Sequence, residues 1–564
     1  MSVPATVTAN IASHLTVMAE RHRDTPAVIA PRRDRAGQLH HTQLTFHELE
    51  EASSQLARGF ERIGIGRGVR TALLIPPSLG FFAVTFALFK VRAVPVLIDP
   101  GIGLRNFGRC LAEAEPAGFI GISKAQAARV LLGWARRTIS MPVTVGLKWF
   151  WGGHTLDAVR QAGVQDETDA DPTPGRARLD APPEPNETAA ILFTSGSTGA
   201  PKGVVYTHEM FSAQVEQLRQ LYGIRPGEID LPTFPLFALF GPALGMTEVL
   251  PEMDFTRPAQ ADPEKIIAAI ERFRVTNMFG SPALINRLGR HGEAHATKLP
   301  SLRRAISAGA PVTAKVLARF AKLLPDGAQV FTPYGATECL PVANIGSDEI
   351  LGGTRAQTDL GQGICVGQPV PGLTLKIIGI TDEPIDAWSD SLELPRGDIG
   401  EIVVQAPQAS RTYFNRAQST ALAKIPLADG GFLHRMGDVG YVDERGRSWF
   451  CGRKSHRVVM QGGTLFTIPC EAIFNKHPAV YRSALVGVPR GATLEPVICI
   501  ELEADARGPV QTKLREELLA LGAQFPHTQT IRTLLFHPAF PVDTRHNAKI
   551  FREKLAVWAK ERIG

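Results

Sequence analysis

Hydroxyl side chains, glycines and one lysine are concentrated in a single loop of the sequence. The loop follows the apolar segment 189–193 and contains Thr194, Ser195, Gly196, Ser197, Thr198, Gly199 and Lys202. Glycines let backbone N–H groups approach an anion closely, and the hydroxyls and the lysine add donors and positive charge. The pattern predicts a strand followed by a polyphosphate-binding loop. It differs from the P-loop of NTPases because Pro201 precedes the lysine. A flexible linker is the alternative, which the preceding apolar strand disfavours.

Further groups suited to nucleotide chemistry follow in two short segments. They are Gly309, Ala310 and Pro311 after the apolar pair 305–306, and Tyr334, Gly335, Thr337 and Glu338 in the segment YGATE. An aromatic face can stack on a purine, and a carboxylate can hold Mg²⁺ through its oxygens. Each segment alone is also typical of an ordinary turn at the end of a strand.

Three charged residues follow nearer the C-terminus. Asp438 stands after Gly437, Arg453 stands after Gly452, and Lys549 ends the segment 541–549. Taken singly, they are typical of a turn or of solvated surface charges. Because they follow the glycine-rich loop and the YGATE segment in a fixed order, we interpret all three as functional residues.

In this order the motifs resemble those of the adenylate-forming superfamily of acyl-CoA synthetases, luciferases and peptide-synthetase adenylation domains. The resemblance extends from about Leu44 to Lys549. It implies an ATP- and Mg²⁺-dependent enzyme that converts a carboxylate into an acyl-AMP. A non-catalytic nucleotide-binding protein is disfavoured because Lys202, Glu338, Asp438, Arg453 and Lys549 are all present.

The resemblance also implies a role for each motif. The residues 194–199, Lys202, 309–311, 334–335, Asp438 and Arg453 would bind the nucleotide, with Asp438 on the ribose hydroxyls. Lys202, Thr337, Glu338 and Lys549 would be catalytic, and Thr198 and Glu338 would hold Mg²⁺. Lys549 would lie between the substrate carboxylate and the α-phosphate. Ala548 stands where the family usually has glycine.

The resemblance places an acyl pocket around the segment 234–241. The implied pocket residues are His208, Phe234, Phe237, Ala238, Phe240 and Gly241. Many fatty acyl-CoA synthetases have histidine where this chain has Ala238, and the smaller side chain would enlarge an apolar cavity. Ordinary core packing explains these apolar residues equally well, and His208 is also compatible with a structural role.

Two departures from the family's pattern narrow the reaction that would follow acyl-AMP formation. Val459 stands where thioester-forming members usually have lysine, and Ser455 replaces a charged hinge residue. With these changes the chain resembles the β-lactone synthetase branch of olefin biosynthesis. The resemblance implies a 2-alkyl-3-hydroxy long-chain fatty acid substrate, a cis-β-lactone product, and a complex with a β-lactone decarboxylase. The alternative is a long-chain fatty acyl-CoA or acyl-carrier ligase.

The order of apolar segments predicts an α/β fold. A chain of 564 residues is too long for one core. A helix is expected from Thr45, its N-cap, to about Ile63, and strands at 69–75 and 94–100. The resemblance implies an N-terminal region, 1–452, of two α/β subdomains plus a β-barrel. A small mobile α+β domain, 453–564, would follow. The polar segment 165–186 predicts an exposed linker.

Composition excludes several classes of protein. The net charge of +6, without a basic run interleaved with aromatics, argues against nucleic-acid binding. Six scattered cysteines without a C-x-x-C pair argue against disulfides and zinc, and favour the cytoplasm. No secretion signal or membrane-spanning helix is expected. The aromatic segment 143–153, with Trp149 and Trp151, is interpreted either as buried packing or as a partner or membrane-surface patch.

Overall fold

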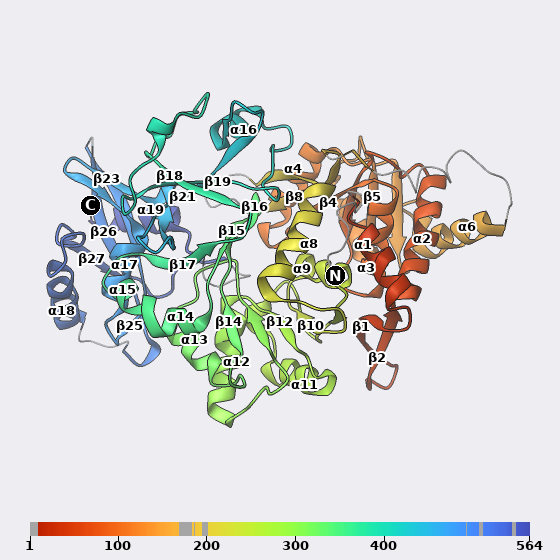
Figure 1. The fold of residues 1–564 in the computed structure, drawn as a ribbon, viewed down its shortest axis with the longest axis horizontal. Coiled ribbons are helices and arrows are strands. Elements are labelled where there is room, and N and C mark those ends of the chain that lie inside the picture. The colour runs from red at the N-terminus through yellow and green to blue at the C-terminus, as the bar shows by residue number, and fades with distance from the viewer. Residues whose placement is uncertain are drawn as a thin grey trace.

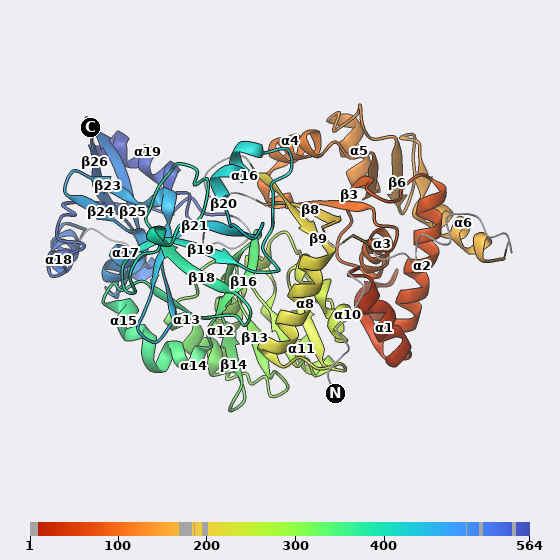
Figure 2. The same ribbon diagram turned by 45° about the horizontal axis from the view of Figure 1, so that its top comes forward.

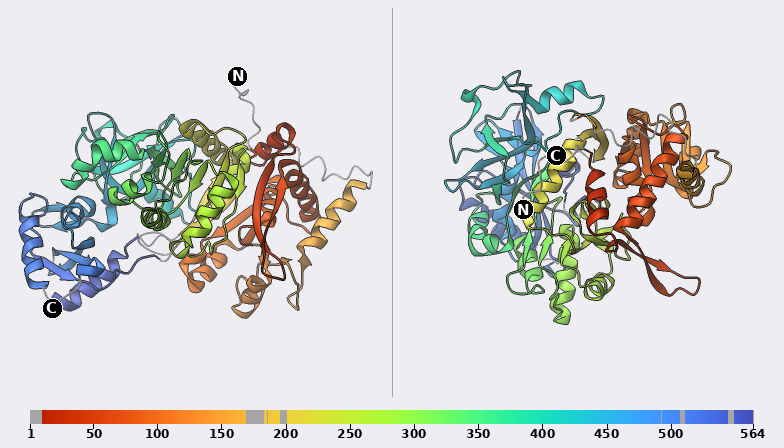
Figure 3. Two further views of the ribbon diagram at one scale, coloured as in Figure 1. Left: turned by 90° about the horizontal axis from the view of Figure 1, so that it is seen from below. Right: turned by 45° about the vertical axis from the view of Figure 1, so that its right-hand side comes forward.

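The computed structural model describes residues 10–168, 183–184, 186–194, 201–491, 493–506, 511–543 and 549–563. Two α/β regions, an antiparallel β region and a C-terminal α+β region follow one another along the chain (Figure 1). Viewed from below, the first α/β region and the C-terminal region lie at opposite ends of the molecule, with the other two regions between them (Figure 3).

The first α/β region is built on a sheet whose strands are parallel except at one edge. Its strand order is β7 (His154–Thr155), β6 (Met141–Val145), β5 (Gly118–Ile122), β3 (Arg70–Leu74), β4 (Val94–Ile98), β8 (Thr188–Thr194) and β9 (Lys202–Thr207), with β9 antiparallel to β8. Its helices are α2 (Phe46–Arg62), α3 (Leu79–Lys90), α4 (Leu104–Ala114), α5 (Ser123–Leu131) and α6 (Leu156–Thr168). Apolar residues run without alternation along the inner strands because helices cover both faces of a parallel sheet.

The second α/β region repeats this plan. Its order is β14 (Gln329–Phe331), β13 (Arg304–Ile306), β12 (Asn277–Phe279), β10 (Ile229–Pro232), β11 (Thr247–Val249), β1 (Pro26–Arg33) and β2 (Leu39–Thr45), with β2 antiparallel to β1. Its helices are α1 (Ser13–Arg21), α8 (His208–Tyr222), α9 (Pro235–Ala238), α10 (Phe240–Leu244), α11 (Pro263–Phe273), α12 (Pro282–His295) and α13 (Ala314–Ala321). The N-terminal segment therefore returns to a sheet formed mainly by residues from the middle of the chain.

The third region is an antiparallel sheet. Its order is β15 (Tyr334–Ala336), β16 (Cys339–Asn344), β17 (Ile364–Pro369), β22 (Ser448–Arg453), β21 (Phe432–Val442), β19 (Gly400–Gln405) and β18 (Thr374–Ile378), and β20 (Lys424–Pro426) pairs with β21. The helices α14 (Ser347–Glu349), α15 (Arg355–Asp359) and α16 (Ala417–Ala423) accompany it. This sheet is the β-rich part that the sequence places before residue 453.

The C-terminal region contains two small sheets. One pairs β23 (Val458–Met460) with β24 (Gly463–Leu465), and the other has the order β25 (Val480–Arg490), β26 (Thr493–Leu502) and β27 (Thr533–Phe536). The helices are α17 (Thr467–Asn475), α18 (Gln511–Ala523) and α19 (Arg552–Ile563). The pairing of β25 with β26 is antiparallel and that of β26 with β27 is parallel. Helices and strands both form this region, in the part of the chain where the α+β domain is expected.

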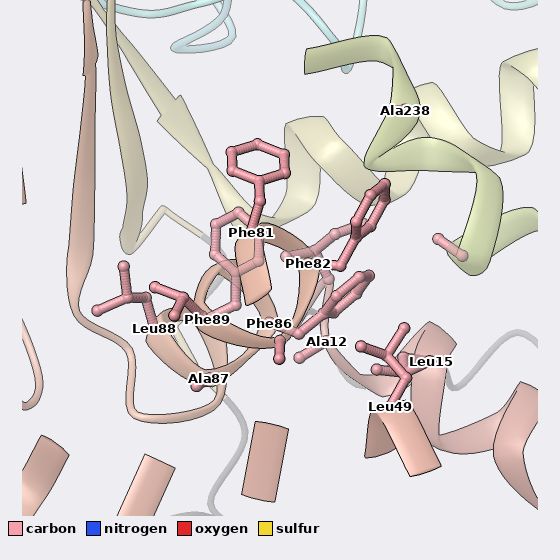
Figure 4. Packing of buried hydrophobic residues seen from close by; sticks show 14 of the residues in the cluster. Ala12, Leu15, Leu49, Phe81, Phe82, Phe86, Ala87, Leu88, Phe89 and Ala238 are labelled. Atoms are coloured by element: carbon pink, nitrogen blue, oxygen red, sulfur yellow. The ribbon is translucent and has the colours of Figure 1, made fainter. Parts of the chain in front are cut away.

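The largest core surrounds α3, which is buried on all sides. In Figure 4, Phe82 and Phe86 lie toward Leu15 of α1 and Leu49 of α2, whereas Phe81 leaves the helix in another direction. This burial explains why 81–100 is apolar without spanning a membrane. Within the described residues, no helix is both long enough and apolar enough to cross a bilayer.

Sequence-based boundaries agree with the structure at the first elements and differ at the linker. The expected helix is α2, and the expected strands are β3 and β4. Thr45 caps α2 through a capping box with Glu48. The linker expected from residue 165 begins later, because α6 continues to Thr168, and 169–182 lie outside the described residues. The boundary at residue 453 stays a prediction; β22 ends there.

The capping box generates a stability prediction. Thr45→Ala removes the oxygen that accepts from the Glu48 amide and should lower the free energy of unfolding by about 1 kcal/mol. Thr45→Ser retains the acceptor and should stay close to wild type. Urea unfolding of the three proteins measures this, and equal midpoints would contradict the assigned cap.

Candidate active site

One cavity of about 1070 Å³ lies where the two α/β regions, the antiparallel sheet and the C-terminal region meet. Parallel strands direct their carboxyl ends to one edge of a sheet, and ligands of open α/β sheets bind there. In the first sheet, the register Ile98↔Phe193 brings the ends of β4 and β8 together. In the second, the register Phe279↔Ile306 does the same for β12 and β13.

Many of the predicted site residues lie on the wall of this cavity. Those on its wall are Lys202, Gly309, Gly335, Thr337, Glu338, Arg453, Lys549, Phe234, Phe237 and Phe240. The loop residues Ser195, Gly196, Ser197, Thr198 and Gly199 lie outside the described residues, and so do 544–548. The loop's two ends are placed, because Thr194 of β8 pairs with Lys202 of β9.

Seven predicted residues are absent from the described part of the wall. They are Ala310, Pro311, Tyr334, Asp438, His208, Ala238 and Gly241. Asp438 nevertheless contacts the wall residue Arg453, and Tyr334 contacts Asp438. The Tyr334 hydroxyl donates to Asp438 Oδ2 at 2.6 Å, and Arg453 Nη1 lies 2.9 Å from Asp438 Oδ1.

The Asp438–Arg453 ion pair follows from strand register. Asp438 of β21 stands opposite Arg453 of β22, and opposed residues of antiparallel strands share a face. Burial raises the pKa of Asp438, and Arg453 opposes that rise. Asp438 in turn raises the pKa of Arg453. An ion pair between a buried aspartate and a partly exposed arginine therefore lies at the last residue of β22, directly before the C-terminal region.

Two tyrosines that sequence reasoning missed position the YGATE segment. Tyr413 donates from its hydroxyl to Glu338 Oε1 at 2.7 Å, and Tyr206 donates to the Thr337 carbonyl at 2.5 Å. Lys202 Nζ lies 5.0 Å from the centroid of the Tyr413 ring, within cation–π range. Neither tyrosine lies in a recognisable motif, so only the tertiary structure identifies them.

A buried ionic network was also missed. Glu401 on the cavity wall pairs with Arg435 at 2.7 Å and with Lys454 at 3.2 Å. Arg435 donates further to the Glu383 carbonyl at 2.7 Å, and Lys454 donates to the Thr381 carbonyl at 2.8 Å. The network attaches Lys454, the first residue after β22, to the antiparallel sheet.

Lys549 is positioned through its backbone by Asp543. The Lys549 amide donates to Asp543 Oδ1 at 3.0 Å, and the Asp543 amide donates to the Lys549 carbonyl at 3.0 Å. A bridge between Val542 and Ile550 continues this pairing. Lys549 is therefore held by backbone hydrogen bonds to Asp543.

The apolar part of the wall is aromatic. Phe234 and Phe237 lie with ring centroids 5.3 Å apart, and Phe237 stacks on Phe279 of β12 at 4.4 Å. Phe211 of α8 adds a ring 6.2 Å from Phe240. Phe279 and Phe211 were absent from the sequence-based set, because a lone phenylalanine in a strand or helix gives no functional signal.

The other three predicted pocket residues lie behind the wall. His208 begins α8, is fully buried, and has a pKa lowered by burial to about 4. Ala238 is fully buried in the core around α3. Gly241 backs onto Glu248 of β11, because an added Cβ would lie 1.3 Å from Glu248 Oε1. Their assignment to the acyl pocket stays a prediction.

Glu338 is the described residue that fits a nucleotide-borne Mg²⁺. The described residues contain no group of three His, Cys, Asp or Glu side chains that could hold a metal ion. Mg²⁺ usually binds one or two protein carboxylates together with substrate phosphates, and therefore needs no such group. Glu338 presents a carboxylate at the cavity, beside Lys202 and Lys549 on the same wall.

Comparisons with known proteins agree with a nucleotide-binding site in this cavity. Residues 15–414 match the family model described as AMP-binding enzyme. The olefin β-lactone synthetase of Xanthomonas campestris is 48% identical over 99% of this chain and 98% of its own length. That of Stenotrophomonas maltophilia is 49% identical over 98% of each chain. The solved amide bond synthetase of Marinactinospora thermotolerans superposes with a TM-score of 0.77 at 24% identity, covering 97% of this chain and 99% of its own.

The contact behind Gly241 generates a prediction. Gly241→Ala places a methyl group on the fully buried Glu248 and should destabilise the protein by roughly 1–3 kcal/mol through overpacking. Gly80→Ala is the matched control, because its Cβ would meet no atom nearer than 3.9 Å. Thermal unfolding distinguishes them: the first variant should melt lower than wild type and the second should not. A wild-type melting temperature for Gly241→Ala would contradict the packing.

Proposed function

The chain belongs to the AMP-binding enzyme family, and from this premise we propose that it is an ATP-dependent β-lactone synthetase of olefin biosynthesis. Its full-length similarity to two olefin β-lactone synthetases supports this product class. The substrate is a 2-alkyl-3-hydroxy long-chain fatty acid. The products are a cis-β-lactone, AMP and pyrophosphate.

One observation carries the proposal: the wall of a single cavity holds both charged and aromatic side chains. Lys202, Glu338, Arg453 and Lys549 stand on the same wall as Phe234, Phe237 and Phe240. A lipid-like acid needs apolar walls for its chains, and a triphosphate needs cations. A cavity with both fits the adenylation of a long-chain acid.

In the first half-reaction the carboxylate oxygen attacks the α-phosphate of ATP. A P–O bond forms, the bond to pyrophosphate breaks, and an acyl-AMP results. Two anions must approach each other, so Lys202 and Lys549 offset their repulsion while Glu338 holds Mg²⁺. Asp438 and Arg453 bind the ribose, Tyr334 packs by the purine, and the loop 194–199 holds the phosphates.

In the second half-reaction the substrate supplies its own nucleophile. The 3-hydroxyl oxygen attacks the acyl carbon and gives up its proton, the bond to the AMP oxygen breaks, and a four-membered lactone closes. This step needs no thiol. Val459 stands at the position where thioester-forming members usually have lysine, which fits an enzyme without a CoA acceptor.

Residues 453–564 act as the mobile domain that delivers and withdraws Lys549. The Asp438–Arg453 pair and the Glu401–Lys454 pair bracket the end of β22 and hold the arrangement with Lys549 at the cavity. Covering the acyl-AMP in this way excludes water, which would otherwise hydrolyse it.

The enzyme works in the cytoplasm beside a β-lactone decarboxylase. Decarboxylation of the strained ring gives the alkene, so an enzyme of that class consumes the product. A long-chain fatty acyl-CoA ligase is the second candidate, because it shares the first half-reaction and differs only in the acceptor.

Lys549→Ala should decrease pyrophosphate release at least about 100-fold, the loss typical of removing one charge-stabilising group. ATP binding should weaken far less, because Lys202 and the phosphate loop remain. Lys560→Ala, an exposed lysine in α19, is the matched control and should retain full activity. Undiminished pyrophosphate release by Lys549→Ala would refute its role.

The product distinguishes the two candidate functions. With ATP, Mg²⁺ and a 2-alkyl-3-hydroxy acid but no CoA, mass and infrared spectra should reveal a lactone. The same acid without its 3-hydroxyl should stop at the acyl-AMP. Turnover that requires added CoA would favour the acyl-CoA ligase instead.

A further inference from the structure

Exposed apolar side chains are concentrated on the outer edge of the first α/β region. This outer patch consists of Val130, Leu131, Leu132, Leu147, Trp149 and Phe150, with exposed fractions from 42% for Val130 to 81% for Leu131. The residues come from the end of α5 and from the segment after β6. Figure 2 shows α5 at the side of the molecule away from the C-terminal helices α18 and α19. Large exposed patches of this kind mark interaction surfaces.

The rings of the outer patch are held from beneath by Trp151. Trp151 is 9% exposed, and its Nε1 donates to Thr144 Oγ1 of β6 at 2.9 Å. The Trp149 ring stacks on it with centroids 5.9 Å apart, and Phe150 lies at 5.6 Å. Arg129 of α5 donates to the Trp151 carbonyl at 3.5 Å, which joins the two halves of the patch. Buried packing, one expectation for this segment, therefore applies to Trp151 and not to its two neighbours.

The chain segment that carries the outer patch has charge of one sign. Between Pro116 and Leu156 the sequence contains Lys124, Arg129, Arg136, Arg137 and Lys148 but no Asp or Glu. Four of these five, all except Arg129, are exposed. Such a surface attracts anions, and an anionic lipid surface is an extended array of them.

The outer patch lies close in the chain to two residues of the active-site cavity wall. Ile122 at the end of β5 and Ala125 in the first turn of α5 both lie on the cavity wall. Ile122 pairs with Val145 of β6, and Ser123 Oγ donates to the Leu147 carbonyl at 2.6 Å. Leu147 of the patch is thus directly attached to a residue beside the cavity wall.

We propose that the outer patch docks on an anionic lipid bilayer, with Trp149, Phe150 and the α5 leucines in the interface. Aromatic rings flanked by basic residues and free of acidic ones suit that interface, where apolar and charged groups are both satisfied. Docking there brings the Ile122 end of the cavity close to the lipid from which the alkyl chains of substrate and product exchange. The exchange of substrate and product with the lipid rests on the proposed function, whereas the docking itself does not.

Vesicle co-sedimentation of the full chain tests the docking. Wild type should sediment with vesicles of phosphatidylethanolamine and phosphatidylglycerol, less with phosphatidylcholine alone, and less as salt is raised. Trp149→Ser combined with Phe150→Ser should lower the vesicle-bound partition at least about tenfold. Leu360→Ser combined with Val557→Ser, at residues 50% and 61% exposed outside the patch, is the matched control and should bind as wild type does.

A kinetic comparison separates docking from catalysis. With the hydroxy acid in detergent micelles, the patch variant should release pyrophosphate at the wild-type rate, whereas with the acid in anionic vesicles it should be slower. If wild type does not bind anionic vesicles, or if the patch variant binds them as strongly as wild type, the docking proposal is wrong. The patch would then be a surface for a protein partner. A wild type that binds vesicles but releases no pyrophosphate in micelles supports the docking and refutes only the proposed function.

Discussion

Two negatively charged groups, a carboxylate and a triphosphate, must be held within bonding distance in a place from which water is largely excluded. Cations must therefore converge on one point, and no single element of the fold can supply them. Lys202 comes from β9, Arg453 from the end of β22, and Lys549 from the C-terminal region. The carboxyl ends of two parallel sheets provide the fixed edges against which these charges meet.

The same requirement explains the buried ion pairs near residue 453. An arginine or lysine withdrawn from water is stable only beside a partner charge. Asp438 provides that charge for Arg453, and Glu401 provides it for Arg435 and Lys454. These pairs keep the end of β22 in a defined position, and hydrogen bonds to Asp543 hold Lys549, which lies on the cavity wall.

The apolar half of the cavity has a different physical basis. Its rings belong to helices and strands whose other faces form the cores, as Phe81, Phe86 and Phe89 of α3 illustrate. Under the proposed function, a long alkyl chain would therefore bind against an extension of ordinary core packing. The outer patch lies in the chain segment that follows Ile122 of this wall, and the sequence from Pro116 to Leu156 contains basic but no acidic residues.

The sequence by itself determined the family, the α/β class, the cap at Thr45 and four charged residues that the structure brings to one cavity wall, Lys202, Glu338, Arg453 and Lys549, because these depend on local spacing and residue type. It did not determine that Phe211 and Phe279 belong to the cavity wall or that Ala238 lies behind it, since an apolar residue in a pattern gives no sign of what it packs against. Nor did it identify Tyr206, Tyr413 or the Glu401 network. Those partners lie far from their targets along the chain, and only folding of the two sheets, the antiparallel region and the C-terminal region against one another brings them together.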